Sequence, residues 1–127
     1  MMYNKVVTDC FFHPKHVGLL DLSNPLVVHF RAKQYKNGTL IDLYMQGNTN
    51  NAIEKICYKT NGNPYIIAAL EWLCREVEGK RFDQLPLINY QILINVLDIS
   101  INQLPAAVHI EQIYQYVLSL MKKKFEE

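Results

Sequence analysis

The stretch from Leu26 to Gln46 reads LVVHFRAKQYKNGTLIDLYMQ and indicates two strands joined by a tight turn. Apolar and polar residues alternate from Leu26 to Lys33 and again from Leu40 to Gln46, which is the period of a strand with one buried face. Asn37-Gly38 lies between them, and this dipeptide favours a type I′ hairpin. A third, less regular strand is expected from Ala52 to Lys59. Because the connections are too short for crossovers, the three strands should form an antiparallel sheet.

Helical periodicity flanks the expected sheet on both sides. A first helix with apolar residues from Tyr3 to Phe11 should end before Pro14. Asn63-Pro64 is a typical helix start, and the apolar stripe that follows it extends to Val77. Two more helices are expected, a short one from Asn89 to Leu97 and a long one that begins near Pro105. The order helix, three strands, three helices predicts an α+β fold.

Length and charge limit the kinds of protein that this chain can be. Its 127 residues are 50% hydrophobic and fit a single domain covering residues 1–127. Thirteen basic and twelve acidic residues give a net charge of +1, which argues against electrostatic binding to nucleic acid or to a membrane surface. No apolar run approaches the roughly 20 residues needed to span a bilayer. The amino terminus lacks a secretory signal pattern, so we expect a cytoplasmic protein.

Several short motifs, taken in order, resemble one known family. Residues 7–18 read VTDCFFHPKHVG, residues 58–62 read YKTNG and residues 78–83 read EGKRFD. The first resembles the opening of the IscU-type iron–sulfur cluster assembly scaffolds, also called the NifU amino-terminal domain, which carry Asn-Pro-Arg-Asn-Val-Gly there. The resemblance spans nearly the whole chain without gaps. It implies a three-stranded antiparallel sheet with helices packed on it, which is the fold that the periodicity predicts.

The same resemblance implies that the family's cluster ligands are missing here. The family holds a nascent cluster with three cysteines, helped by an aspartate and a histidine, because soft thiolates suit iron in a sulfur-bridged cluster. The positions aligned with these ligands are Asn37, Thr39, Asn63, Leu104 and Pro105. The family's chaperone-docking segment, Leu-Pro-Pro-Val-Lys, aligns with residues 98–102, which read DISIN. We therefore expect no cluster and no other cofactor at this site.

The replacements share a structural logic. Asn37 before Gly38 suits the hairpin turn, Asn63 suits a helix N-cap and Pro105 suits a first helical turn. Such a cap contributes about 1 kcal/mol to stability. Each residue thus favours local backbone structure over metal ligation, while Gly38 and Gly62 keep the backbone shape beside two of the lost ligands.

The cysteines and histidines offer only an alternative metal site. An odd number of widely spaced cysteines without a C-x-x-C motif predicts reduced thiols packed in the core. His13 and His16 are expected in solvated loops, and His29 on the exposed face of its strand. His109 is expected at the boundary of the core, with its hydrogen bonds satisfied. Glu71 and Arg75 should pair on the outer side of their helix. The alternative is a metal or cluster bound by some of these residues, possibly shared across a dimer. The residues concerned are Cys10, Cys57, Cys74, His13, His16, His29 and His109.

These observations lead to one main hypothesis on function. No nucleophile, base and orienting group are placed together and no glycine-rich phosphate loop occurs, so the chain is not expected to be an enzyme. We expect a divergent scaffold-family protein that acts as a protein-interaction or regulatory module. Its expected partners are a cysteine desulfurase or a competent scaffold paralogue, and it could form a homo-oligomer. The alternatives are a metal-binding or iron–sulfur scaffold with non-standard ligands, and a small-molecule pocket in the vacated site.

Overall fold

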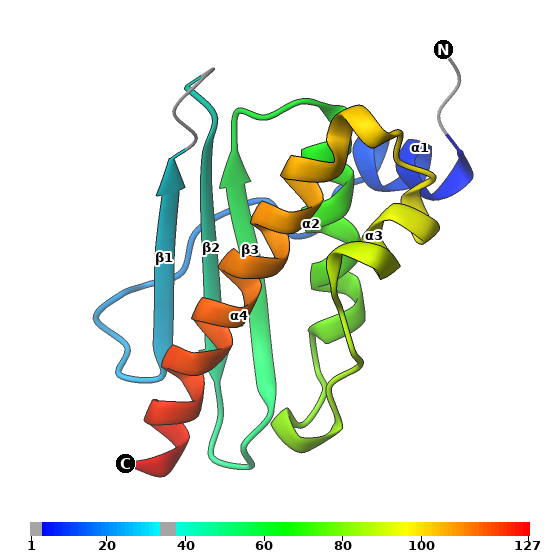
Figure 1. Cartoon of the computed structure of the whole chain (residues 1–127). Coiled ribbons are helices and arrows are strands. Elements are labelled where there is room, and N and C mark those ends of the chain that lie inside the picture. The colour runs from blue at the N-terminus through cyan, green and yellow to red at the C-terminus, as the bar shows by residue number, and fades with distance from the viewer. Residues whose placement is uncertain (1–3, 34–37) are drawn as a thin grey trace.

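The computed structural model describes residues 4–33 and 38–127, which form an antiparallel sheet with helices packed on it (Figure 1). Strands β1 (Val27–Lys33), β2 (Leu40–Gly47) and β3 (Ile53–Thr60) lie side by side in chain order. The predicted three-stranded meander is confirmed. Asn37, predicted in the hairpin turn, lies outside the described residues. Gly38 has a φ of 70°, in the left-handed region that favours glycine.

The helices also follow the prediction closely. They are α1 (Lys5–Phe12), α2 (Pro64–Val77), α3 (Tyr90–Leu97) and α4 (Leu104–Glu126), with the short 3₁₀ turns η1 (Phe82–Gln84) and η2 (Ile101–Gln103). Asparagine begins three of these helices, and its side-chain oxygen accepts a hydrogen bond from the backbone N–H three residues on. These caps are Asn4, Asn63 and Asn89. The fold is α+β, as the sequence predicts.

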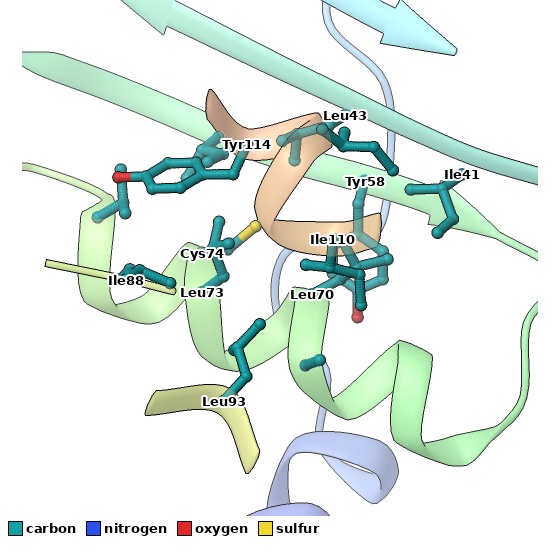
Figure 2. Packing of buried hydrophobic residues seen from close by; sticks show 14 of the residues in the cluster. Ile41, Leu43, Tyr58, Leu70, Leu73, Cys74, Ile88, Leu93, Ile110 and Tyr114 are labelled. Atoms are coloured by element: carbon teal, nitrogen blue, oxygen red, sulfur yellow. The ribbon is translucent and has the colours of Figure 1, made fainter. Parts of the chain in front are cut away.

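One face of the sheet and the helices enclose the core. Ile41 and Leu43 of β2 point toward α2 and α4, where they meet Leu70 and Ile110 (Figure 2). All four side chains are at most 1% exposed. In Figure 1, α4 crosses in front of the sheet and α2 and α3 lie beside it, on the same side. The sheet is therefore covered by helices on one face only.

The connection between α1 and β1 runs along the other side of the sheet. In Figure 1 it passes behind the strands. At its start it extends β3 by a short parallel bridge, in which Tyr58 N–H donates to the His16 carbonyl and Gly18 N–H donates to the Tyr58 carbonyl, both at 2.9 Å. The connection thus supplies hydrogen-bond partners for backbone groups on the edge of β3 that faces away from β2.

Two outward-pointing residues of β2 are less exposed than strand alternation predicts. Asp42 is 6% exposed and Tyr44 is 8% exposed. Asp42 accepts hydrogen bonds from His29 and Arg31 of β1, and the Tyr44 ring stacks on the His29 ring with centroids 4.2 Å apart. Cross-strand neighbours therefore bury these side chains although they point away from the helices.

No helix in the described part of the chain combines the length and the apolar character that a membrane span requires.

Candidate functional site

Three chain segments meet at one end of the molecule, which we call the tip: residues 38–40 at the hairpin, residues 61–63 between β3 and α2, and residues 103–105 at the start of α4. Side-chain amides join them. Asn61 Nδ2 donates to the Gly38 carbonyl at 3.2 Å, and Asn61 Oδ1 accepts from Leu40 N–H at 2.8 Å. Asn63 Nδ2 donates to Gln103 Oε1 at 3.1 Å. The structure thus brings together the positions that the sequence analysis singles out, apart from Asn37, which lies outside the described residues.

Asn63 is engaged at both ends of its side chain. Its Oδ1 accepts from Ile66 N–H at 3.0 Å, which satisfies one free amide of the first turn of α2. The preceding residue, Gly62, packs so closely on this turn that an added Cβ would come within 2.8 Å of Ile66 Cγ2. The predicted N-cap is confirmed, and the close approach of the Ile66 side chain leaves no room for a side chain at position 62.

The remaining positions of the tip carry no strong metal donor. Thr39 is 7% exposed, Leu104 is the half-buried first residue of α4, and Pro105 is exposed in its first turn. Proline fits there because the N–H groups of a helix's first turn have no intrahelical partner, so the N–H that proline lacks would not be hydrogen-bonded within the helix. Over the described segments, the tip therefore offers a hydroxyl, amides and apolar side chains. The amide oxygens of Asn61 and Asn63 are already hydrogen-bonded, and none of these groups is the soft thiolate that an iron–sulfur cluster needs.

The three cysteines lie in α1, β3 and α2 and are buried and unpaired. Burial raises the pKa of the Cys10 thiol to about 11 and that of Cys57 to about 11, and it raises the pKa of Cys74 well above its usual value. The thiols are therefore neutral at physiological pH and poorly reactive. No group of three or more His, Cys, Asp or Glu side chains in the described ranges is arranged to hold a metal ion. The predicted core packing is confirmed for Cys10 and Cys74, whereas Cys57 is buried on the opposite face of the sheet, beside Tyr44.

Three of the four histidine predictions need correction. His13 is solvent-exposed as predicted, with 71% of its side chain accessible. His16, however, is only 11% exposed and contacts two carboxylates, and His29 is 22% exposed and hydrogen-bonded to Asp42. His109 Nε2 is buried without a hydrogen-bond partner among the described residues, and burial lowers the pKa of this ring. These long-range contacts leave no mark on the local sequence pattern.

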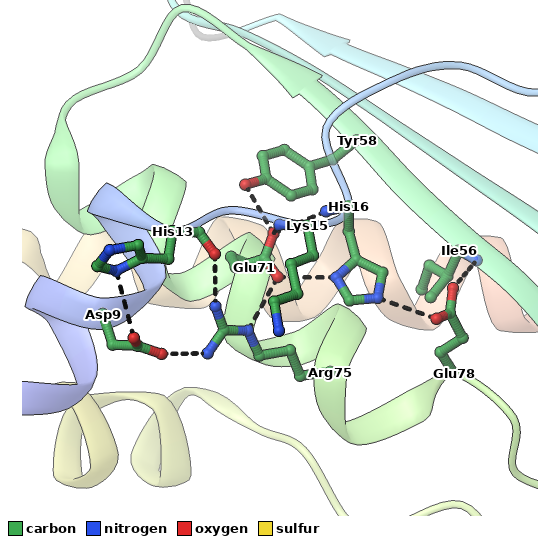
Figure 3. Close-up of polar contacts among 9 residues, drawn as sticks. All are labelled: Asp9, His13, Lys15, His16, Ile56, Tyr58, Glu71, Arg75 and Glu78. Carbon is green, nitrogen blue, oxygen red and sulfur yellow. Dashed lines mark hydrogen bonds and ion pairs between the residues drawn. The ribbon is translucent and has the colours of Figure 1, made fainter.

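Glu71 is the most unexpected residue of the structure, because its side chain is completely buried. The prediction of an exposed Glu71–Arg75 pair is wrong about exposure, although the pair itself exists, with Arg75 Nε 2.9 Å from Glu71 Oε2. The other carboxylate oxygen, Oε1, accepts from the N–H groups of Lys15 and His16, both at 3.0 Å, and from the Tyr58 hydroxyl at 3.2 Å (Figure 3). Glu71 thereby fastens the α1–β1 connection to α2 and β3.

His16 and Arg75 extend this network outward. His16 Nδ1 lies 2.7 Å from Glu71 Oε2, and His16 Nε2 lies 3.1 Å from Glu78 Oε1, so both ring nitrogens face carboxylate oxygens. Arg75 also donates to Asp9 of α1 at 2.5 Å (Figure 3). Burial opposes ionisation of Glu71, but the hydrogen bonds from His16 and Arg75 outweigh it, so the pKa of Glu71 is lowered.

One sequence signal could have located the buried carboxylate. Between Tyr65 and Cys74, Glu71 is the only charged residue. A helix that is apolar around most of its circumference is buried on more than one side, so a single charge within it requires internal partners. Its backbone partners, the amides of Lys15 and His16, lie 56 and 55 residues earlier in the chain, beyond the reach of periodicity.

The sheet, the helices on one of its faces and the three-segment tip define a single class of fold, an α+β domain with a three-stranded antiparallel meander. The model of the NifU-like N terminal domain matches residues 2–125. The chain therefore belongs to the NifU-like N-terminal domain family, and it is an iron–sulfur cluster assembly scaffold-like protein.

Solved structures show the same fold at low sequence identity. The N-terminal part of a nitrogen-fixing NifU-like protein from Brucella abortus is 12% identical, with a TM-score of 0.59, and the match covers 97% of this chain and 93% of that one. A putative iron–sulfur cluster assembly scaffold for the SUF system from Fervidobacterium islandicum is 16% identical, with a TM-score of 0.56 and coverage of 97% and 88%. A hypothetical protein is 19% identical, with a TM-score of 0.52 and coverage of 96% and 95%. Among curated protein sequences, none matches the chain.

Proposed function

We propose that this protein is a protein-interaction or regulatory module of iron–sulfur cluster assembly, and that it holds no cluster at its tip. The observation that carries the proposal is the chemistry of the tip. Where the family resemblance places cysteine, aspartate and histidine ligands, the described residues are Thr39, Asn63, Leu104 and Pro105. Amide and hydroxyl oxygens are hard donors and bind iron in a sulfide-bridged cluster poorly.

The ordered backbone of the tip supports a role for its shape. Gly38 has a left-handed conformation and Gly62 packs closely on Ile66. Asn63 caps α2 and reaches Gln103 at the start of α4, so the three segments stay joined without a metal. Relaxing a functional site in this way commonly gains stability. A partner that recognises the shape of a scaffold could therefore still bind.

The proposed partners are a cysteine desulfurase or a cluster-competent scaffold paralogue from the same cell, met in the cytoplasm. Binding to either would let the protein compete with, or modulate, a working scaffold. The proposal includes no catalytic step, because the described residues of the tip include no nucleophile with a base beside it. A homo-oligomer remains compatible with this role.

Size-exclusion chromatography of purified proteins tests the interaction. The chain is mixed separately with the desulfurase and with the competent scaffold, and a matched sample contains an unrelated protein of similar size. We expect co-elution with at least one of the two family partners. Independent elution from both partners, at concentrations of about 50 μM at which even modest affinities give a visible complex, would refute the interaction role.

A further inference from the structure

The sheet face opposite the helices, which we call the outer face, carries a one-sided charge. The strand register places four basic side chains and Asp42 on this face, and Glu54 at the bulge of β3 also reaches it, where its carboxylate accepts from Gln46 Nε2 at 2.7 Å. The basic ones are Arg31, Lys33, Lys55 and Lys59. The whole chain, by contrast, has thirteen basic and twelve acidic residues. Positive charge is therefore concentrated on the outer face, and the rest of the protein is slightly negative.

Among the described residues, neither Asp42 nor Glu54 forms an ion pair with the lysines of this face. Arg31, Asp42 and Lys59 are register partners in a row across the three strands. Asp42 Oδ1 accepts from His29 Nε2 at 2.8 Å and from Arg31 Nε at 2.9 Å. Burial opposes ionisation of Asp42, but these hydrogen bonds outweigh it and lower its pKa, so its charge is matched by its own neighbours. In the described ranges, Lys33, Lys55 and Lys59 take part in none of the ion pairs.

A hollow next to the tip gives this charge a defined position. It has a volume of about 300 Å³ and lies beside the start of β2 and the end of β3. Its lining residues are Arg31, Leu40, Asp42, Lys59, Thr60 and Asn61. Asn61 belongs to the tip, where its side chain forms hydrogen bonds with the Gly38 carbonyl and the Leu40 N–H. A segment seated in this hollow would therefore also contact the tip.

We propose that the outer face binds an acidic segment of a protein partner, whose carboxylates pair with Arg31 and Lys59 in the hollow beside the tip. This inference rests on the proposed function and names the surface and the chemistry of the interaction. Charge complementarity supports it. Arg31 contacts Asp42 through Nε, which leaves its Nη groups to bind a partner's carboxylate, and the ammonium of Lys59 is unpaired within the described structure. Such a patch steers acidic partners and fixes their orientation.

The same surface is poorly suited to nucleic acid or to a free phosphate. Proteins that bind single strands stack bases on exposed aromatic rings, whereas Tyr44 is 8% exposed and stacks on His29. Phosphate sites often use free backbone amides, but Leu40 N–H donates to Asn61 and Gly62 N–H donates to Thr60. A carboxylate needs only the side-chain cations that the face presents.

Fluorescence anisotropy with a labelled hexaglutamate peptide tests the site. The test variant carries Lys33→Glu and Lys59→Glu, which reverse two charges without touching the Arg31–Asp42 pair. The control variant carries Lys122→Glu and Lys123→Glu, the same chemistry near the end of α4. We expect the test variant to bind about tenfold more weakly than the wild type and the control variant to bind within about twofold of it. Circular dichroism verifies that both variants fold.

Three results would overturn the proposal. The first is equal weakening in both double variants, which would indicate a diffuse effect of net charge. The second is absence of peptide binding at low ionic strength, where exposed charges interact most strongly. The third is tighter binding of a labelled oligothymidylate than of hexaglutamate.

The partner proteins separate this inference from the proposed function. If the desulfurase or the scaffold binds the Lys33→Glu/Lys59→Glu variant as tightly as the wild type, the assignment of the surface fails and the interaction role stands. If neither protein binds the wild type but hexaglutamate shows the expected pattern, the interaction role fails and the acidic-segment site stands.

Discussion

The Glu71→Gln substitution removes the charge from a buried carboxylate that accepts five hydrogen bonds, and we expect it to destabilise the protein strongly. Glutamine has nearly the same shape, so packing is preserved. Its one oxygen can replace Oε1 and keep the bonds from the backbone of Lys15 and His16 and from Tyr58. The NH₂ group then faces His16 Nδ1 and Arg75 Nε, which are donors themselves.

The expected loss follows from these two bonds. A hydrogen bond to a charged group contributes about 1.5–3 kcal/mol, and breaking a buried ion pair costs about 3–5 kcal/mol. Arg75 retains Asp9 as a partner, which favours the lower end of the range. We therefore expect a loss of about 3 kcal/mol, within a total stability of about 5–15 kcal/mol for a domain of this kind, so the variant should still fold.

Urea unfolding followed by circular dichroism measures this loss. The matched control is Glu76→Gln on the same helix, because the Glu76 side chain makes no hydrogen bond or ion pair within the described ranges. The two variants should differ in unfolding midpoint by about 1–3 M, given a slope of about 1–3 kcal/mol per M in urea. Equal midpoints for the two variants would show that Glu71 does not hold the α1–β1 connection in place.

The same measurements lead to three further predictions. The pKa of Glu71 is lowered on folding from an ordinary value of 4.5, so its contribution to stability is complete above that pH and is lost as the pH falls through the folded pKa. The unfolding free energy of the wild type should therefore fall more steeply below about pH 5 than that of Glu71→Gln. Parallel pH profiles of the two proteins would contradict this. Asn63→Ala should cost about 1 kcal/mol in urea unfolding through loss of the α2 cap, and an unchanged midpoint would remove the cap from the account. The buried thiols of Cys10, Cys57 and Cys74 should not react with Ellman's reagent in the native protein and should all react after unfolding; rapid native labelling would refute their placement.

Local signals in the sequence were sufficient to predict the elements of the fold. Alternation locates β1 and β2, and Asn63-Pro64 marks the first turn of α2 to the residue. These features depend on neighbours a few positions apart, so they can be read without knowing the tertiary structure. The tip was also predictable, because the positions aligned with the family's ligands, apart from Asn37, fall on the three segments that meet there.

The buried polar network was not predictable in the same way. Glu71 and Arg75 are spaced like a surface pair, but the carboxylate is buried by a segment that comes 55 residues earlier in the chain. His29 and Asp42 look exposed from strand alternation, yet His29 is only 22% exposed and Asp42 is buried, because they contact each other and His29 stacks on Tyr44. Periodicity gives the direction of a side chain, whereas its burial depends on which distant groups pack against it.

The proposed loss of cluster binding depends on the donor set of the tip within an otherwise intact scaffold fold. A variant that restores the family's ligands provides a matched control. It carries Asn37→Cys, Thr39→Asp, Asn63→Cys, Leu104→His and Pro105→Cys. If the backbone of the tip is preserved, this variant regains the thiolates that iron requires. It also loses the α2 cap, so its folding is verified separately by circular dichroism.

Anaerobic reconstitution with ferrous iron and sulfide, followed by desalting and absorption spectroscopy, tests this loss most directly. The account predicts that the wild type retains no visible chromophore after desalting, whereas the ligand-restored variant retains one. A stable, cysteine-ligated cluster on the wild-type protein would contradict the account, and loss of that chromophore in Cys10→Ser or Cys57→Ser would then identify the thiols that bind it.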